Sequence, residues 1–515
     1  MSELEQHATE VLKFSARNAR PKRPAYLRDA TVDSDGNIAV LKQSEHLRPL
    51  VVDLDGTLLR SDLLIETAFA ELSRRPLALL ELIAALKQGK AALKHRLAAT
   101  AVFDPAVLPY DEEVLRCIRQ ARAEGRPVYL ASASHEVLVG AVADHLELFD
   151  GWFATDELTN CAGKVKAHKL VEAFGEKGFD YIGNDAADLH VWPHAAKALA
   201  IRAPARVGRA LASSSDDVEH LTHERAGWKA WAKLMRVHQY AKNGLVFVPL
   251  ITSQMFELAA FMHVLVAAIA FSLCASSVYI LNDLIDLQDD RGHRSKRHRP
   301  LANGSVPLSE AMLAIPVLLG ISLALGAWVS LPFLGVLLGY FALTSAYTFL
   351  LKRKMIADVI TLAGLYSVRV VGGAVALSVV LSPWLLAFTM SWFLSLALIK
   401  RYVELQARRE ANLPDATSRD YRNDDIHMVG ALAAAASLNA ITLFLLYASS
   451  ESVVTTFSRP EILWFVAPIL AYWIGRALLV ARRGEMHDDP VVFALKDRLS
   501  VATLATAGVL FVAAF

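Results

Sequence analysis

Apolar residues follow two different patterns along this 515-residue chain. Up to about residue 235 they are mixed with charged residues, as in soluble domains, whereas from residue 244 onward they form long runs separated by short charged loops. Runs of this length can cross a bilayer as helices. The pattern therefore predicts a soluble domain and then an all-α membrane domain with nine spans, at 244–256, 258–281, 309–330, 331–351, 358–380, 383–399, 429–449, 461–481 and 497–515.

Changes in composition divide the chain into four predicted regions. Residues 1–45 form a mobile tail, residues 46–210 the soluble domain, residues 211–235 a polar linker, and residues 236–515 the membrane domain. No apolar run follows the charged residues at the N-terminus. We therefore expect no signal peptide and a soluble domain that stays in the cytoplasm.

Lys and Arg cluster in alternate loops of the membrane half. They follow the second, fourth, sixth and eighth predicted spans, whereas the opposite loops contain essentially only Arg459. Because basic loops stay inside, we expect a multi-pass protein of the cytoplasmic (inner) membrane. The first span is short and contains Pro249, so it is also compatible with a re-entrant segment; if it crosses, the soluble domain lies on the cytoplasmic side.

Composition also narrows the range of partners. The formal net charge is +1, so no nucleic acid or other polyanion is expected as a partner of the whole chain. Cys117, Cys161 and Cys274 have neither metal-type nor disulfide-type spacing, which suits a reducing compartment. The lipid bilayer is the partner that the composition predicts.

The stretch NDLIDLQDD, residues 282–290, places carboxylates at the end of the second predicted span. On a helix, the spacing of Asp283, Asp286 and Asp290 puts them on one face, with Asn282 beside them. Carboxylates at a membrane boundary usually mark function, and Mg²⁺ is commonly held by a few carboxylates plus substrate phosphate oxygens. We therefore predict a Mg²⁺–diphosphate site, whose remaining anionic oxygens contact the basic residues Lys296, Arg297 and Arg299. The alternative is a solvated helix end.

The pattern N-D-x-x-D-x-x-x-D, together with the nine predicted spans, resembles the UbiA superfamily of intramembrane prenyltransferases over residues 236–515. The resemblance implies nine transmembrane helices around a central cavity. It also implies two Asp-rich loops that hold the Mg²⁺-bound diphosphate of an isoprenyl donor. The usual second motif, D-x-x-x-D, is not evident, and the acidic candidates for a second site are Asp358, Glu404, Asp424 and Asp425.

Several stretches of the membrane half are similar to one branch of this superfamily, the polyprenyl-phosphate phosphoribosyltransferases. They include RVHQYAKN, NDLIDLQDDRGHRSKRHRPLANG, KRYVEL and DDPVVFALKDR. In that branch the soluble diphosphate is phosphoribosyl pyrophosphate, and polyprenyl phosphate is the acceptor. The Asp-rich motif itself indicates a diphosphate but not which substrate carries it. Transfer from an isoprenyl diphosphate to an aromatic acceptor of the 4-hydroxybenzoate type therefore stays open.

Other polar residues of the membrane half are candidates for binding phosphate. Lys242 and Asn243 precede the first span and either bind phosphate or anchor the chain at the interface. Asp358, at the start of the fifth span, is either functional or a helix cap. Arg369 lies in the middle of that span, so we expect it to face the cavity and pair with an anion or an acid.

The soluble half contains three apolar stretches that end in polar residues: LVVDLDGTLL, VYLASAS and DYIGNDAADL. Each is predicted to be a buried strand that delivers these residues to the carboxyl edge of a sheet. The motifs resemble the haloacid dehalogenase (HAD) superfamily over residues 48–205, which implies a Rossmann-like α/β fold. That resemblance assigns Asp53 as nucleophile and Asp55 as general acid/base. Thr57 and Ser132 would be phosphate-binding hydroxyls, and Lys166 would balance the phosphate charge. Asp53 and Asp188 would be Mg²⁺ ligands, with Asp185 as a further candidate.

Residues 62–124 are largely helical by pattern and are expected to form a small cap that selects the phosphoester. Within them, PLALLELIAALKQGKAALKHRL is apolar with a basic C-terminal half. This pattern is typical of a cap helix, and it is also compatible with a helix on a membrane surface.

Two classes of function remain open for the whole chain. One is a Mg²⁺-dependent transferase that joins a diphosphate substrate to a polyprenyl lipid, with an attached phosphatase that acts on the product. The other is a transporter or lipid-binding scaffold with a regulatory soluble domain. Transporters usually show internal repeats. None is evident in this sequence, so the enzyme is favoured.

Overall fold

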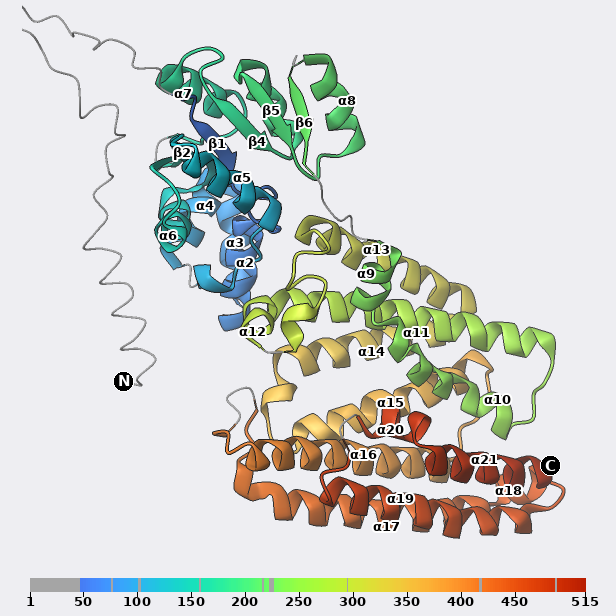
Figure 1. Ribbon diagram of the computed structural model, residues 1–515. Helices are drawn as coiled ribbons and strands as arrows, with labels where there is room; N and C mark the ends of the chain where they lie inside the picture. Colours follow the sequence, from blue (N-terminus) through green and yellow to red (C-terminus); the bar gives the residue numbers. More distant parts are fainter. Residues whose placement is uncertain are drawn as a thin grey trace, which may run out of the picture. The chain divides into compact units, whose positions relative to one another are not determined.

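The computed structural model describes residues 47–515 except 76, 101–102, 157–158, 215–216, 222–226, 294, 416–418 and 487–488 (Figure 1). The predicted tail, 1–45, lies outside the described residues. The chain forms two compact units. The first comprises the chain up to Trp231 together with Asp283–Ser309, and the second comprises Ala232–Asn282 and Glu310–Phe515.

The first unit is built on a parallel sheet of six strands in the order β3-β2-β1-β4-β5-β6. In register, Val51 of the first strand lies between Tyr129 and Tyr181 of its two neighbours. The central strand is buried along its whole length, as expected for a parallel sheet that is covered on both faces. The strands are β1 (Leu50–Asp53), β2 (Val128–His135), β3 (Gly151–Thr155), β4 (Asp180–Gly183), β5 (Lys197–Ala200) and β6 (Val218–His220).

Helices cover both faces of this sheet, so the predicted α/β fold is confirmed. Apolar side chains of α5 (Glu112–Ala123) and α6 (Glu136–Leu146) pack on one face. Those of α7 (Lys164–Phe174) and α8 (Ala205–Ser214) pack on the other. Between β1 and β2 the chain forms helices, as predicted for the cap: α2 (Leu63–Arg74), α3 (Ala78–Gln88), α4 (Lys90–Thr100) and η2 (Pro105–Val107).

The region predicted as a linker, 211–235, is partly structured. It contains the end of α8, the edge strand β6 and helix α9 (Trp228–Leu234). Residue Val218 pairs with Ala198, so the sheet extends beyond the predicted domain boundary at residue 210. Short 3-10 helices η3 (Ala186–His190) and η4 (Trp192–His194) complete the loop between β4 and β5.

The segment Asp283–Ser309 belongs to the first unit through a buried ion pair. Arg291, on the short helix α12 (Leu287–Gly292), lies 2.5 Å from Glu66 of α2, and both side chains are almost completely buried. Gln288 donates a second hydrogen bond to Glu66 at 2.8 Å. Gly304 has φ +69°, and a side chain at this position would collide with Arg60. Glycine therefore permits the close approach of this segment.

The second unit is helical and consists of long antiparallel helices joined by short turns (Figure 1). Its elements are η5 (Val237–Phe247), α10 (Val248–Thr252), α11 (Leu258–Ile285), α13 (Leu308–Val329), α14 (Leu331–Phe349), η7 (Leu351–Arg353), α15 (Ala357–Ala376), α16 (Pro383–Glu410), η8 (Asn423–Asp425), α17 (Ile426–Ala448), α18 (Glu451–Thr456), η9 (Pro460–Phe465), α19 (Val466–Arg482), α20 (Pro490–Lys496) and α21 (Arg498–Ala513).

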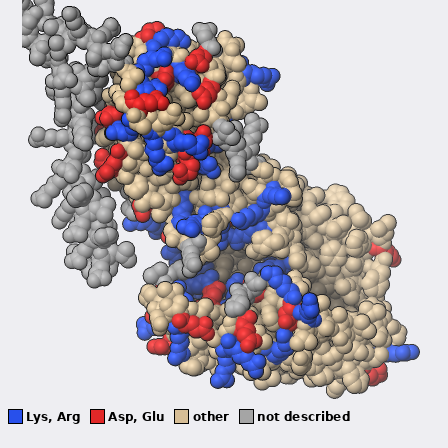
Figure 2. Space-filling model, in the orientation of Figure 1, with Lys and Arg blue, Asp and Glu red and all other residues tan. Residues whose placement is uncertain are grey.

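Among the described residues, seven helices are long and apolar enough to cross a membrane, so the predicted count of nine is not confirmed. Figure 2 shows broad parts of this surface without charged residues, as expected for a face that contacts lipid. The seven are Leu258–Ile285, Leu308–Val329, Leu331–Phe349, Ala357–Ala376, Pro383–Glu410, Asn423–Ala448 and Pro460–Arg482.

The other two predicted spans are a short helix and a broken one. The last, α21, has only 16 residues. The first consists of η5 followed by the five-residue helix α10, whose second residue is Pro249. It still runs antiparallel to α11, because Tyr240 contacts Ser276 and Asn243 contacts Ser272, at 2.9 and 2.8 Å. Its close packing on α15 requires a glycine at residue 373, where any side chain would meet the backbone of η5.

Candidate active sites

The first candidate site lies at the carboxyl edge of the parallel sheet, where strand β1, the loop after it, helix α7 and the 3-10 helix η3 bring four predicted residues together. Lys166 donates to Asp53 at 2.7 Å and lies 3.5 Å from Asp188. Thr57 donates to the other oxygen of Asp53 at 3.0 Å. All four side chains are buried. The predicted nucleophile, its charge partner, one hydroxyl and the second acid therefore come together.

Asp55 is held by a separate set of donors. The hydroxyl groups of Ser132 and Ser134 donate to one of its oxygens at 3.0 and 2.7 Å, and the backbone N–H of Leu63 donates to the other at 2.8 Å. Ser132 thus contacts Asp55 as well as facing the site. The sequence reasoning missed Ser134, although it lies two positions after Ser132 on the same strand and therefore on the same face.

Tyr181 and Asn184 also belong to this site and were not predicted. The Tyr181 hydroxyl accepts from Lys166 at 3.0 Å and donates to Asp188 at 2.6 Å. The backbone N–H groups of Asn184 and Asp185 donate to the second oxygen of Asp188 at 2.9 and 3.0 Å. The side chain of Asp185 instead caps η3 and is exposed. Asp188 is therefore the acid that faces the nucleophile.

Burial sets the electrostatics of this cluster. It raises the pKa of Asp53 to about 7, with Lys166 opposing the rise and Asp188 adding to it. Burial alone would favour a neutral Lys166, but the two carboxylates raise the pKa of its ammonium above the usual value. Two buried carboxyl groups thus share one cation. An additional cation would balance the remaining negative charge.

Arg202 supports the loop that follows Asp55, and no sequence signal indicated it. It donates to the backbone carbonyls of Gly56 and Thr57 at 2.8 and 2.7 Å. Its guanidinium also pairs with the fully buried Asp111, to which Arg60 donates at 2.9 Å. Burial alone would raise the pKa of Asp111, but Arg202 and Arg60 lower it. This network fixes the loop between the nucleophile and the cap.

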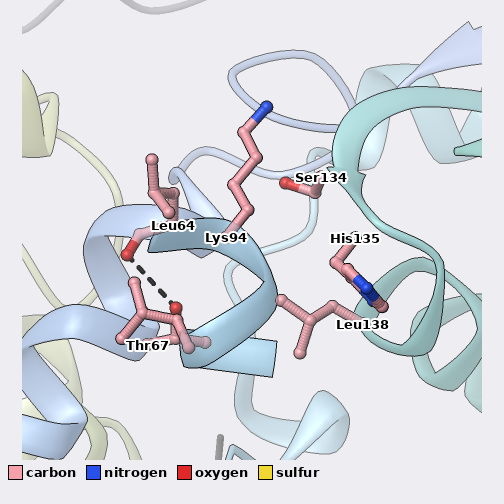
Figure 3. Close-up of a pocket in the computed structure, with 7 residues that line it drawn as sticks. Leu64, Thr67, Lys94, Ser134, His135 and Leu138 are labelled. Carbon is pink, nitrogen blue, oxygen red and sulfur yellow. Dashed lines mark hydrogen bonds between the residues drawn. The ribbon is translucent and has the colours of Figure 1, made fainter. Parts of the chain in front are cut away.

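A small pocket adjoins the first site, between the cap helices α2 and α4 and the end of β2 (Figure 3). Its wall includes Ser134, which donates to Asp55. Lys94 reaches across to the backbone carbonyl of Ala133 at 2.6 Å. A group bound beside Asp55 would therefore contact the cap. The lining residues are Leu64, Thr67, Lys94, Leu97, Ser134, His135 and Leu138.

The second candidate site is the Asp-rich segment of the first unit. Arg299 bridges two carboxylates, lying 3.1 Å from Asp283 and 2.5 Å from Asp290, both of which are buried. Lys296 lies 3.9 Å from Asp290. Burial raises the pKa of Asp290 to about 6, with Arg299 opposing the rise. The predicted continuous helix is interrupted at the half-buried Asp286, where α11 ends and α12 begins, so the tertiary fold brings Asp283 and Asp290 together.

Neither Arg297 nor Asn282, both predicted for this site, takes part in the ion pairs between Arg299 and the two carboxylates. Arg297 is exposed on the 3-10 helix η6 (Lys296–His298). Asn282, in the second unit, accepts a hydrogen bond from Lys352 at 3.4 Å. Arg299 therefore supplies the positive charge that balances these clustered carboxylates.

The third candidate site is a buried cationic cluster in the second unit, which joins three predicted residues. Arg369 donates to the side chain of Asn243 at 2.7 Å and to the Tyr340 hydroxyl at 2.9 Å. Lys242 and Arg369 lie over the ring of Tyr366, at 5.5 and 5.7 Å. Arg369 was predicted to pair with an anion or an acid; its hydrogen-bond partners among the described residues are neutral, which leaves the anion as the open alternative. The tyrosines were missed, although Tyr366 lies one helical turn before Arg369.

The four acidic residues proposed for a second Asp-rich site do not form one cluster. Asp358 is fully buried beside Arg401 at 2.8 Å and accepts from Tyr421 at 2.7 Å. Glu404 is paired with Arg401 and Arg419. By contrast, two of the four lie on the short helix η8: Asp424 is exposed, and Asp425 accepts from the backbone of Arg422 at 2.8 Å.

A model of the UbiA prenyltransferase family matches residues 247–504, and a model of the haloacid dehalogenase-like hydrolases matches residues 50–191. The chain belongs to the UbiA prenyltransferase family. With its seven apolar helices, this UbiA-family chain is a multi-pass membrane protein that also carries a HAD-type domain.

Three known proteins illustrate these similarities. The uncharacterized protein y4nM of Sinorhizobium fredii is 35% identical over 88% of each chain. The decaprenyl-phosphate phosphoribosyltransferase of Mycolicibacterium smegmatis is 31% identical over 54% of this chain and 89% of its own. A solved structure of a UbiA homolog from Archaeoglobus fulgidus, bound to GPP and Mg²⁺, has 15% identity and a TM-score of 0.42, covering 55% of this chain and 99% of its own.

The buried Glu66–Arg291 pair leads to a stability prediction. Arg291→Met should leave Glu66 buried without a cation, which costs about 3–5 kcal/mol in comparable pairs. We expect a lower unfolding midpoint of the first unit, measured by thermal proteolysis of the purified chain. Arg297→Met, an exposed change in the same segment, should have no such effect. Adding Glu66→Gln to Arg291→Met should restore part of the lost stability. An unchanged resistance to proteolysis in Arg291→Met alone would contradict a stabilising role of the ion pair.

Proposed function

We propose that this chain transfers a phosphoribosyl group from phosphoribosyl pyrophosphate to a polyprenyl phosphate. The observation that carries the proposal is the buried pair of carboxylates, Asp283 and Asp290, held together by Arg299 at the end of a membrane-spanning helix. A carboxylate pair with adjoining basic residues suits a metal-bound diphosphate. The similarity to decaprenyl-phosphate phosphoribosyltransferases supports phosphoribosyl as the transferred group.

Magnesium fits both sets of carboxylates. Asp290 keeps one buried oxygen for which the described residues supply no hydrogen bond, and Asp53 and Asp188 share the single cation of Lys166. No group of three or more His, Cys, Asp or Glu residues in the described ranges is arranged as a metal site. Mg²⁺ is usually bound by only one or two carboxylates with water and substrate phosphates. One or two of Asp283, Asp286 and Asp290 in one site, and Asp53 with Asp188 in the other, would therefore suffice to hold it. When bound, it would neutralise phosphate charge.

The cationic cluster of the second unit suits the phosphate of the lipid acceptor. Arg369 is buried beside neutral partners, so its charge is balanced by no acid within the described residues. A buried guanidinium attracts an anion strongly because little water screens the charge. Lys242 and Arg369 would bind the lipid phosphate, and Asn243 would hold Arg369 in position. The acceptor oxygen would then attack the sugar carbon as pyrophosphate leaves.

We further propose that the HAD-type domain removes the phosphomonoester that remains on the transferred sugar. Asp53 attacks phosphorus, and Asp55 donates its proton to the departing alcohol oxygen. Water, deprotonated by Asp55, then releases phosphate from the aspartyl intermediate. Lys166 offsets the charge of Asp53 during both steps, and Ser132 and Ser134 keep Asp55 oriented.

Charge distribution supports a cytoplasmic location for both activities. The basic residues of the loops that follow α11, α14 and α16 would remain on the cytoplasmic side of the inner membrane. The soluble HAD-type domain joins the first of these loops in one compact unit. The proposed transfer would therefore draw on cytoplasmic phosphoribosyl pyrophosphate, and both proposed reactions on cytoplasmic Mg²⁺.

The donor can be tested directly with membranes that contain the protein. Given phosphoribosyl pyrophosphate and polyprenyl phosphate, they should form a lipid whose mass increases by one phosphoribosyl group, or by ribosyl after dephosphorylation. Given an isoprenyl diphosphate and 4-hydroxybenzoate, they should form no prenylated aromatic product. Mass spectrometry of the extracted lipids distinguishes the two. If prenylated 4-hydroxybenzoate formed without a phosphoribosyl lipid, aromatic prenylation would replace the proposed function. If neither product formed, a scaffold function would be favoured.

A further inference from the structure

The cap helix α3 carries apolar residues on both its inner and its outer face. Its inner face, formed by Ala78, Leu82 and Ala85, is buried. Its outer face exposes four large apolar side chains, and Leu77 just before the helix is 82% exposed. The exposed side chains of the outer face are Leu79, Leu80, Ile83 and Leu86.

An exposed face of large apolar side chains is unfavourable in water, so such a face is normally covered. Clustered exposed apolar residues of this kind mark a surface that contacts a protein or a membrane. Most exposed apolar residues elsewhere in the first unit are isolated, such as Val137 and Val165. The outer face of α3 is therefore a surface that lacks a partner within the unit.

The charges around α3 favour an anionic bilayer as that partner. The acid within the helix, Glu81, is already paired with Arg96 and Arg75. Exposed Arg74 precedes the helix and exposed Lys87 lies in its last turn. An apolar face flanked by basic residues is typical of helices that lie in a membrane interface.

The neighbouring contacts tie α3 to a membrane boundary. The preceding helix, α2, holds Arg291 of the segment Asp283–Ser309 through Glu66. That segment continues at one end into α11 and at the other into α13, both of them long enough to span a membrane. The cap helices are thus attached to a part of the chain that cannot leave the membrane surface.

We propose that α3 lies in the surface of the lipid bilayer, and that the HAD-type domain therefore acts on a phosphomonoester of a membrane lipid. The choice of substrate rests on the proposed phosphatase function, whereas the docking does not. Helix α4 separates the pocket beside Asp55 from a second pocket of 760 Å³, which is lined by both α3 and α4. This second pocket places polar residues beside α3: Glu81, Gln88, His95, Arg96 and Asp156.

The docking can be measured on the full chain in nanodiscs of phosphatidylcholine and phosphatidylglycerol. A Cys117→Ser background leaves two buried cysteines. A fluorophore on Leu80→Cys should lose roughly half of its emission to nitroxide lipids, because an interfacial helix seats its apolar face about 5–10 Å into the bilayer. The matched control is Val165→Cys, on the surface of α7, which should be quenched only by iodide in the water.

Equal iodide access at the two positions, with no quenching by lipid, would overturn the docking. Protection of Leu80→Cys that requires two copies of the chain in one disc would also overturn it, in favour of a dimer contact. Both readouts are independent of catalysis. A wild-type chain that releases phosphate from no substrate would therefore refute the phosphatase function while the quenching still decides the docking.

A second variant tests the lipid substrate. Leu80→Glu with Ile83→Glu should slow phosphate release from the phosphoribosyl lipid by about tenfold or more, because surface attachment raises the effective concentration of the substrate. Hydrolysis of soluble p-nitrophenyl phosphate should stay unchanged. Equal loss on both substrates would indicate damage to the active site and would overturn the proposed role of the bilayer.

Discussion

Replacing Asp283 or Asp286 by Ala is expected to reduce lipid transfer by about two orders of magnitude or more, because each change removes negative charge from the proposed Mg²⁺–diphosphate site. Asp283→Ala also removes one of the two carboxylates that Arg299 contacts on this segment. The measurement is the initial rate of phosphoribosyl lipid formation in membranes with equal amounts of inserted protein.

The matched control is Asp289→Ala, an exposed carboxylate in the same stretch that makes neither contact with Arg299. It should retain wild-type transfer. Excess chelator should stop transfer by the wild-type protein and by this control alike. Full turnover of Asp283→Ala, or of the wild type in chelator, would exclude the carboxylate pair as a metal-bound diphosphate site.

Replacing Asp53 by Asn should stop the phosphatase and leave the transferase running, so that the phosphorylated lipid accumulates. The amide keeps the hydrogen-bonding shape of the side chain but cannot act as the nucleophile. A loss of about three orders of magnitude or more is expected for removal of a covalent nucleophile. Lipid mass spectrometry would show the phosphoribosyl form alone, and Asp283→Ala would show neither form.

Asp144→Asn provides the control, because its carboxylate is exposed on α6 and distant in sequence from every catalytic motif. It should release phosphate at the wild-type rate. Continued release of phosphate from the lipid by Asp53→Asn would show that another enzyme in the membranes performs this step, and that the HAD-type domain serves a different substrate.

The predictable part of the first site follows from local sequence. An apolar strand that ends in Asp53, and another that leads to Ser132, must both reach the carboxyl edge of a parallel sheet. Their functional residues therefore lie close together, independently of the loop conformations. The support by Arg202 and Tyr181 was not predictable. Arg202 contacts Asp111, which is 91 positions earlier, and Gly56 and Thr57, which lie still farther away along the chain. No local sequence pattern indicates pairs at such distances.

The Asp-rich motif was also evident from sequence, but its geometry was not. Regular helical spacing suggested one face for Asp283, Asp286 and Asp290. The structure breaks the helix at Asp286 and uses Arg299 to bring the two outer carboxylates together. The first predicted span is broken in the same way, since Pro249 lacks the N–H group that would continue the regular helix.

By itself, the sequence determined the division into a soluble and a membrane part, the motif residues of the first two candidate sites and the apolar character of α3, because hydrophobic runs and strand ends are local properties. Only the tertiary structure decided which charges are paired. It joined Glu66 to Arg291, surrounded Arg369 with neutral partners and left one face of α3 exposed. Burial and ion pairing depend on side chains that meet from distant parts of the chain, and hydrophobic periodicity along one segment contains no information about them.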